Sequence, residues 1–196
     1  RYPPDQSILA VDVVRHVGEE VAAVAAINHE ILAQALKMIE IEYEILPAVF
    51  DVEDAMSSDC QVHIHPNHPR VKENYCNIAG KTQTQWGDID AGFKEADLIH
   101  SDRFESHLRT HGYMEPQTAV ADYSGDGTLH MWISSMGHFG KRRKLAKTLG
   151  MKDASIRIHK AYVGGAFGGK IDLFSHEYCV AALSIKTGRP VKYVAS

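Results

Sequence analysis

Hydrophobic and polar residues follow two different periods along the first fifty residues, and each period predicts a kind of secondary structure. Residues 8–14 and 21–26 are apolar runs that predict two strands. Asn28 is a suitable N-cap for a following helix. The apolar residues of that helix lie on one face: Ile31, Leu32, Ala35, Leu36 and Ile39. Residues 41–45 then alternate apolar side chains with glutamates, which predicts a half-exposed strand that Pro47 ends.

The next segment lacks either period. Residues 52–91 are rich in Asp, Ser, His, Pro, Asn, Gly and Thr, which is typical of a linker. A connection of this length is unusual inside one compact domain, so it predicts a domain boundary. We therefore expect a first domain portion at 1–51, a linker at 52–91 and a second domain portion at 92–196.

Regular patterns return after the linker and predict an α+β fold. Strands are predicted at 97–107, 118–123, 129–135 and 155–162, and again from residue 191 to the end. A turn of the hairpin type at 124–127 joins two of these strands. Helices are predicted at 137–149 and 172–187, where Gly150 and Gly188 are suitable C-caps.

Charge and cysteine content exclude several classes of protein. Lys and Arg number 21 against 25 Asp and Glu, so the chain lacks the basic excess of a nucleic-acid binder. No apolar run approaches the ~18 residues of a membrane span. The three cysteines form no C-x-x-C pair, which argues against an iron–sulfur cluster or zinc ribbon and favours a reducing cytoplasm. The sequence begins with Arg1 rather than a signal peptide, and we expect a longer parent chain.

The strongest chemical signal is a cluster of glycines between a predicted strand and a predicted helix. Gly164, Gly165, Gly168 and Gly169 lie within six residues. Glycine permits positive φ and lets main-chain N–H groups approach a ligand closely. A helix N-terminus beyond the loop favours an anionic or oxygen-bearing ligand. The alternative is a tight turn with crowded packing, which needs no ligand.

Two nucleotide-binding motifs can be compared with this loop. The G-x-G-x-x-G spacing is absent. The P-loop pattern is nearly met by Gly164, Gly169 and Lys170, but Ile171 stands where Ser or Thr must reach magnesium. A P-loop-like nucleotide-binding protein is therefore an alternative interpretation.

Residues 163–170 resemble the GGGFGGK loop of the molybdenum-binding subunit of the xanthine dehydrogenase/aldehyde oxidase family. Further segments are similar to that subunit in the same order: 12–24 and 49–51 to its α/β-hammerhead domain, 87–93 to the start of its molybdenum-binding domain, 111–120 to its H-x-x-M-E-P segment, and 188–192 to a later strand. Together they cover nearly the whole chain, so the chain resembles an internal fragment of that subunit.

The resemblance implies a fold and an activity. Residues 1–51 would be the C-terminal part of an α/β-hammerhead domain, followed by the start of a molybdopterin-binding α+β domain. Such enzymes hydroxylate an aldehyde or N-heterocycle with oxygen from water. The implied cofactor is molybdopterin with molybdenum, which can be the cytosine dinucleotide form. The implied partners are the remainder of the molybdenum subunit and iron–sulfur and FAD subunits or domains.

The resemblance also implies a site. The residues placed against the cofactor are Gly164, Gly165, Ala166, Phe167, Gly168 and Met136. Met136 stands where the family usually has Gln, and a thioether cannot replace an amide. This departure keeps open a non-catalytic or assembly member of the family. Ile171 stands where purine-oxidising members have Glu, which predicts a more apolar substrate pocket. The family's catalytic Glu belongs to a part beyond this chain, so we expect no catalytic residue and no protein ligand to a metal here.

Four other features receive structural interpretations. Cys60, His63, His65 and His68 could bind zinc, but the adjacent prolines favour a solvated loop. The basic helix at 141–147 could meet phosphate, although a solvated face is favoured. His111 and Glu115 are expected to be structural, because Pro116 discourages the helix that would align them. Ser134 and Ser135 lack the His and Asp of a serine nucleophile.

Overall fold

The computed structural model describes residues 7–66 and 77–195, which divide into two compact units. One unit consists of residues 1–43 and 110–196, and the other of residues 44–109. The domain boundaries expected at 51 and 91 stay a prediction. No helix among the described residues is long and apolar enough to cross a membrane.

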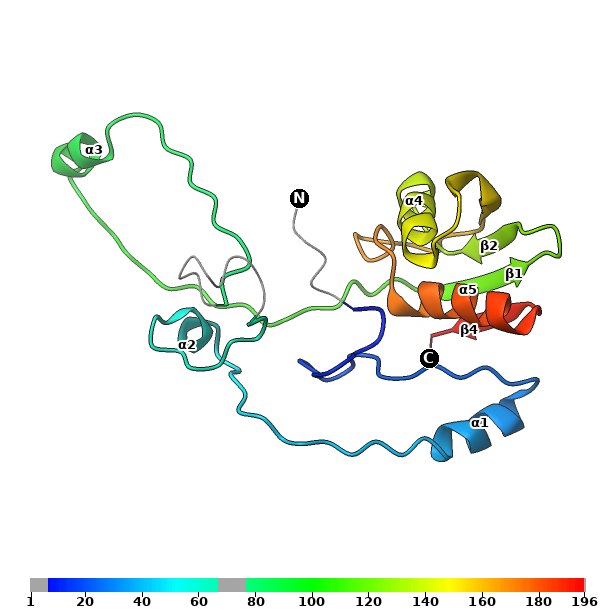
Figure 1. Ribbon diagram of the computed structural model, residues 1–196. Coiled ribbons are helices and arrows are strands. Elements are labelled where there is room, and N and C mark those ends of the chain that lie inside the picture. Colours follow the sequence, from blue (N-terminus) through cyan, green and yellow to red (C-terminus); the bar gives the residue numbers. More distant parts are fainter. Residues whose placement is uncertain (1–6, 67–76, 196) are drawn as a thin grey trace. The chain divides into compact units, whose positions relative to one another are not determined.

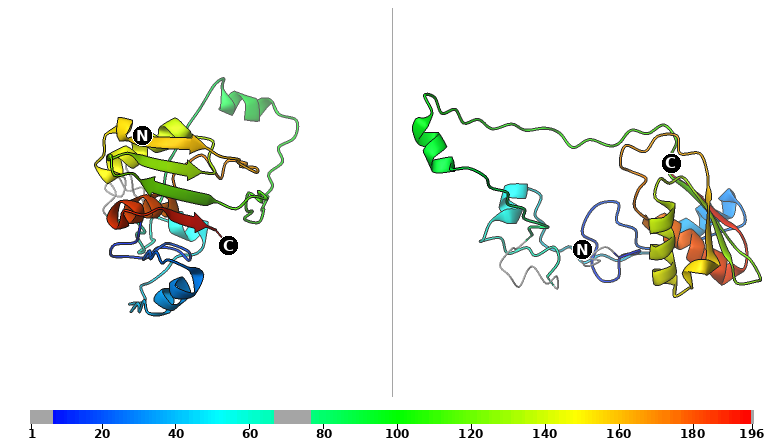
Figure 2. Two further views of the ribbon diagram at one scale, coloured as in Figure 1. Left: turned by 90° about the vertical axis from the view of Figure 1, so that its right-hand side faces the viewer. Right: turned by 90° about the horizontal axis from the view of Figure 1, so that it is seen from above.

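A four-stranded mixed sheet is the centre of the unit formed by residues 1–43 and 110–196 (Figure 1). Its strands are β1 (Thr118–Tyr123), β2 (Leu129–Ile133), β3 (Ile156–Lys160) and β4 (Val191–Val194). The order across the sheet is β3-β2-β1-β4, and the left view of Figure 2 shows the strands side by side. β1 pairs antiparallel with β2 and β4, whereas β2 and β3 are parallel. The predicted hairpin at 124–127 is confirmed by this pairing.

Two helices pack on one face of the sheet and close the hydrophobic core. α4 (His138–Leu149) connects the parallel strands β2 and β3, as a crossover helix must. α5 (Ser175–Thr187) packs mainly on β1, where Ala119 and Ala121 allow close approach. The core also contains Leu129, Met131, Ile133, Leu145, Ala146, Ile156, Val180 and Ala181. A 3-10 turn (Asp153–Ser155) leads into β3.

The predicted helix ends in this unit are confirmed. Gly150 and Gly188 have φ values of 66° and 62°, so each ends its helix in the left-handed conformation. α1 (His29–Lys37) begins after Asn28, whose side-chain oxygen accepts a hydrogen bond from the Ile31 amide at 2.9 Å. Local capping chemistry therefore predicted these boundaries correctly.

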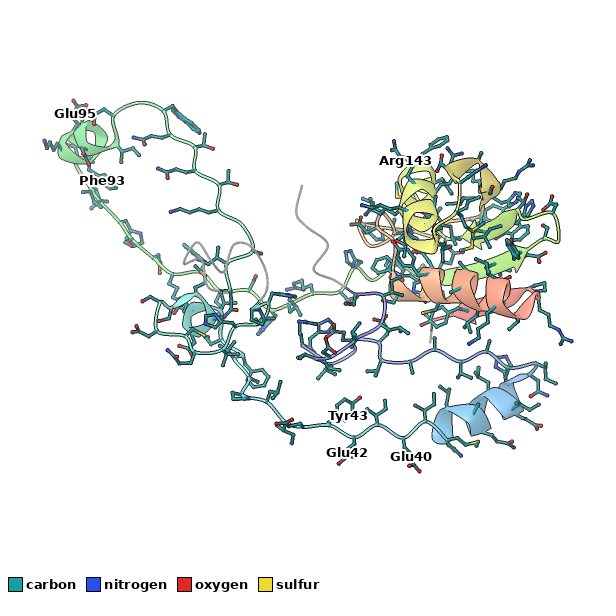
Figure 3. The ribbon with its side chains drawn as sticks, viewed as in Figure 1. Glu40, Glu42, Tyr43, Phe93, Glu95 and Arg143 are labelled. Atoms are coloured by element: carbon teal, nitrogen blue, oxygen red, sulfur yellow. The ribbon has the colours of Figure 1, made fainter. Side chains whose placement is uncertain are left out.

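The strands predicted at 8–14, 21–26, 41–45 and 97–107 were wrong, because no strand ladder forms there in the described structure. The alternation predicted around residues 41–45 is still visible, since Figure 3 shows Glu40 and Glu42 on one side of the chain and Tyr43 on the other. A ladder also needs a partner strand and a face to bury. Val11 and Ile45 remain 80% and 94% exposed, so the face is not buried there.

The described part of residues 44–109 contains two short α-helices that the sequence pattern did not predict. α2 (Val52–Met56) follows Asp51 and α3 (Ile89–Glu95) follows Asp88, and each aspartate caps the first turn. Asn77 ties the loop after α2 together through the carbonyls of Ala55 and Val62, at 3.1 and 2.8 Å. Of the possible zinc ligands, His68 lies outside the described residues, and no metal-binding cluster occurs among the described ones.

Candidate functional site

The glycine loop follows β3 and precedes α5, and its main chain takes a conformation that few residues allow. Gly164, Gly165 and Gly168 have φ values of 48°, 97° and 92°. Phe167, at 46°, is the one non-glycine residue with positive φ within residues 7–66 and 77–195. A bulky residue in this region is strained, and strain of this kind concentrates at functional sites.

Close packing explains two of the glycines. A Cβ on Gly164 would collide with the Glu115 side chain. A Cβ on Gly169 would lie 2.8 Å from the ring of Tyr113 and 3.1 Å from that of His111. The crowded-turn interpretation is therefore correct for the inner side of the loop, where the 111–117 segment lies against it.

Gly168 lies on the outer side of the loop and is explained differently. Its nearest neighbour, His111 Nε2, would be 3.8 Å from an added Cβ, which is ordinary contact. Gly164 and Gly168 are exposed, and Phe167 is 75% exposed. Main-chain N–H groups of residues 165–168 donate to no acceptor in the described part of the chain. The outer side is thus not a sealed turn, and the loop contains main-chain donors that no internal acceptor uses.

Lys170 ends the loop and is fully buried, with 0% exposure. Its Nζ lies 2.6 Å from the Val163 carbonyl, 2.7 Å from Ser134 Oγ, and 2.9 and 3.0 Å from the carbonyl and Oε2 of Glu115. It also lies over the Tyr113 ring, 4.7 Å from the centroid. A P-loop lysine must reach a phosphate. The P-loop interpretation is therefore wrong, because internal oxygens occupy this ammonium.

Glu115 is the anion that balances Lys170. Partial burial raises the pKa of Glu115, but hydrogen bonds from Ser134 and Lys170 and the charge of Lys170 outweigh it, so the pKa lies below its ordinary value. Ser134 Oγ is 2.8 Å from the same carboxylate oxygen. His111, Glu115 and Ser134 thus support the loop, as expected for the first two.

Met136 and Ile171, which the sequence placed at the cofactor and the substrate, lie beside each other at the end of the loop. We call them the rim residues. The Met136 amide donates to the Lys170 carbonyl at 3.1 Å, so the ends of β2 and of the loop run together. A Cβ on Gly137 would lie 2.9 Å from the Ile171 carbonyl. Met136 and Ile171 are 63% and 54% exposed. The candidate site therefore combines free main-chain donors with exposed apolar side chains.

The basic helix is exposed at Arg143, Lys144 and Lys147, as expected, but three of its basic residues also pair with acidic ones. Lys141 is buried against Glu177, with Nζ–Oε1 at 2.7 Å. Arg142 pairs with Asp153 at 2.6 Å, and Lys144 with Asp172 at 2.9 Å. The expectation of a solvated side chain was wrong for Lys141. Helix periodicity cannot show that α5 supplies a carboxylate to this lysine.

Comparison with known proteins identifies the architecture. Residues 67–196 match the molybdopterin cofactor-binding domain family. The chain belongs to the molybdopterin-binding subunits of the xanthine dehydrogenase/aldehyde oxidase family. This membership agrees with the resemblance seen in the sequence, and it accounts for a mixed α+β unit in which a glycine loop precedes the last helix and strand.

Members of the xanthine dehydrogenase/aldehyde oxidase family match nearly all of the chain. It is 35% identical to the nicotinate dehydrogenase large molybdopterin subunit of Eubacterium barkeri, covering 98% of this chain and 43% of that protein. It is 31% identical to the xanthine dehydrogenase/oxidase of Mus musculus, covering 96% and 13%. The crystal structure of quinoline 2-oxidoreductase from Pseudomonas putida 86 superposes with a TM-score of 0.86 at 28% identity, covering 96% and 23%. The chain thus spans less than half of each of these relatives.

Sequence reasoning missed the part of the site that lies behind the loop. It read Lys170 only as a possible phosphate ligand and dismissed Ser134 as a nucleophile. Gln117, whose Nε2 donates to the Gly169 carbonyl at 2.9 Å, was not singled out. The one available signal was a lysine directly after the glycine cluster, together with an acidic residue in the H-x-x-M-E-P segment.

Proposed function

We propose that residues 164–168 hold molybdopterin, and that the full-length protein is a molybdenum hydroxylase acting on an aldehyde or N-heterocycle. One observation carries the proposal: the N–H groups of residues 165–168 have no acceptor among the described residues, and the loop presents them beside an exposed Gly168. Donors that the fold holds in place suit the oxygen atoms of a metal centre or a phosphate. The residues present therefore fit this cofactor.

Each loop residue has a distinct proposed role. Gly164 allows the loop to lie against Glu115, whereas Gly165 and Gly168 permit its positive-φ turns. Ala166 is buried and anchors the loop, and Phe167 presents an amide from a strained conformation. When bound, molybdopterin with molybdenum supplies the redox chemistry that adds water-derived oxygen, and the chain supplies binding and orientation.

The rim supports a substrate with an apolar body. Ile171 and Met136 expose side chains that exclude water and offer no carboxylate for the polar edge of a purine. Relatives are named for nicotinate and quinoline, which are N-heterocycles. We therefore propose Ile171 as a substrate contact and an N-heterocycle or aldehyde, rather than xanthine, as the substrate.

The remaining parts of the enzyme are proposed from the family. Residues 1–51 would complete the C-terminal part of an α/β-hammerhead domain, and residues 92–196 would begin the molybdopterin-binding domain. The rest of the molybdenum subunit would supply the catalytic glutamate. Iron–sulfur and FAD subunits or domains would accept the electrons, and the cofactor can carry a cytosine dinucleotide. The assembly would work in the cytoplasm.

The test uses the full-length protein with its partner subunits. We expect near-stoichiometric molybdenum and pterin, and transfer of isotopic oxygen from labelled water into an N-heterocycle or an aldehyde. A folded protein that contains neither molybdenum nor pterin would contradict the proposal.

Met136 favours a second candidate function, a non-catalytic or assembly member of the family. A thioether offers no donor beside the metal, and this weakens the chemistry without removing the main-chain donors of the loop. Such a protein would retain the cofactor but turn over no substrate. Measured turnover in a molybdenum-loaded preparation would exclude it.

A further inference from the structure

Lys170 joins three segments that are distant in the sequence. Its ammonium contacts Glu115 from the segment before β1, Ser134 from the end of β2, and the Val163 carbonyl at the start of the loop. All four contacting oxygens lie between 2.6 and 3.0 Å from Nζ, and the side chain is fully buried.

The ammonium has no capacity left for a ligand. A protonated lysine has three N–H donors, and four internal oxygens already surround it. Any effect of Lys170 on a bound cofactor must therefore act through the groups that it holds in place.

Those groups fix both ends of the glycine loop. The Val163 carbonyl is held by Lys170 Nζ at the start, and the Lys170 carbonyl accepts from the Met136 amide at the end. Close to that end, Gln117 Nε2 holds the Gly169 carbonyl at 2.9 Å. Between these anchored points Gly164, Gly165, Phe167 and Gly168 take positive φ. The Gly164 carbonyl also accepts a hydrogen bond from the Glu115 amide at 3.3 Å.

We propose that Lys170, Glu115 and Ser134 form a buried clasp that preorganises the loop for its cofactor, with Lys170 as the positioning residue. This inference rests on the proposed function. A loop already ordered in the binding conformation loses less entropy when the cofactor binds, so retention is tighter. Disrupting the clasp should leave the donors present but no longer aligned.

The alternative is that the clasp stabilises the fold and nothing more. The same unit provides a matched control, because Lys141 and Glu177 form another buried pair within the helical layer, with side chains 2% and 3% exposed. Its residues are not part of the loop. A purely structural role predicts that equivalent changes in either pair affect cofactor retention equally.

The experiment compares two double variants of the full-length protein, Lys170→Met/Glu115→Gln and Lys141→Met/Glu177→Gln. Each removes both charges of one pair, so neither leaves an unpaired buried ion. The measurements are molybdenum and pterin per folded protein, together with the thermal midpoint. We expect about a tenfold loss of cofactor in the first variant, which is typical when a supporting contact of a metal site is removed, and unchanged occupancy in the second.

Two further variants keep the test decisive. Glu115→Gln alone retains an oxygen acceptor for Lys170 and should restore most of the cofactor. Ser134→Ala removes one clasp oxygen with little change in volume. It serves as the test variant if the double variant does not fold, and we expect it to lose molybdenum and pterin several-fold. Wild-type occupancy in the folded Lys170→Met/Glu115→Gln variant, or in Ser134→Ala if that double variant does not fold, overturns the clasp. Absence of molybdopterin from the wild-type protein overturns the proposed function and the clasp with it.

Discussion

The unit that contains the sheet has two ion pairs formed by a buried lysine and a glutamate, and their surroundings differ. At the loop, Lys170 contacts the Glu115 carboxylate, two main-chain carbonyls and a hydroxyl. The pKa of Glu115 lies below its ordinary value. In the helical layer, burial lowers the pKa of Lys141 and raises that of Glu177 despite their mutual attraction. For Glu115, hydrogen bonds and the charge of Lys170 together outweigh desolvation, whereas for Lys141 and Glu177 desolvation outweighs their attraction.

This difference separates two uses of a buried charge. A pair dominated by desolvation adds little net stability, although losing one partner is costly. A pair surrounded by additional oxygens fixes the positions of those oxygens, and here one of them is the Val163 carbonyl at the start of the loop. The helical pair thus organises α4 and α5, whereas the loop pair organises the candidate site.

The largest expected effect comes from breaking the helical pair on one side. Lys141→Met leaves the Glu177 carboxylate buried without its cation, so the free energy of unfolding should fall by about 3–5 kcal/mol. Denaturant unfolding measures the loss. A fall below about 1 kcal/mol would show that water solvates Glu177 after the change.

Breaking the loop pair on one side should destabilise less. Lys170→Met leaves Glu115 behind, and that side chain is 30% exposed and can be partly hydrated. We expect a loss of about 2–3 kcal/mol in the same unfolding measurement. A loss larger than that of Lys141→Met would reverse the comparison between the two pairs.

A pH profile distinguishes the two regions further. Burial and the charge of Lys141 lower the pKa of His176 to about 4 from 6.5. Because the unfolded chain binds the proton first, stability should fall as pH drops from about 6.5 to about 4, by about 1–2 kcal/mol after allowance for screening. His176→Phe keeps the ring that stacks on Tyr193 and should remove this slope. If the dependence of stability on pH is unchanged in His176→Phe, other groups cause it.

The smallest change in stability is expected at the rim. Met136→Gln replaces an exposed side chain, so the free energy of unfolding should change by less than about 0.5 kcal/mol. An amide can donate a hydrogen bond that a thioether cannot, so we expect kcat of the loaded protein to rise. Steady-state kinetics tests this, and an unchanged or lower kcat would contradict a role for position 136.

How much the sequence could predict depended on how local each signal is. The glycine caps at 150 and 188 and the hairpin turn are set by neighbouring residues, so those elements were predicted correctly. The caps Asp51 and Asp88 carried the same kind of signal for α2 and α3, but the composition of the segment obscured it. Strands at 8–14 and 41–45 failed because a ladder depends on a partner that alternation cannot reveal.

The candidate site could also be predicted only where the signal came from neighbouring residues. Glycine spacing predicted where the loop lies, and its contact with a cofactor stays a prediction. The clasp behind it was not predictable, because Lys170 and Glu115 are 55 residues apart and meet only after the sheet forms. Likewise, a basic helix pattern could not show that Lys141 would face Glu177.

The most direct test of the central claim compares Gly168→Val with Gly127→Val in the full-length protein. Both glycines have similar φ values, 92° and 84°, and an added Cβ at either has its nearest neighbour at 3.8 Å. Backbone strain is therefore matched, and only Gly168 lies beside the free N–H groups. We expect Gly127→Val to retain molybdenum per folded protein and Gly168→Val to lose it. Equal molybdenum content in the two variants would contradict the placement of the cofactor at this loop.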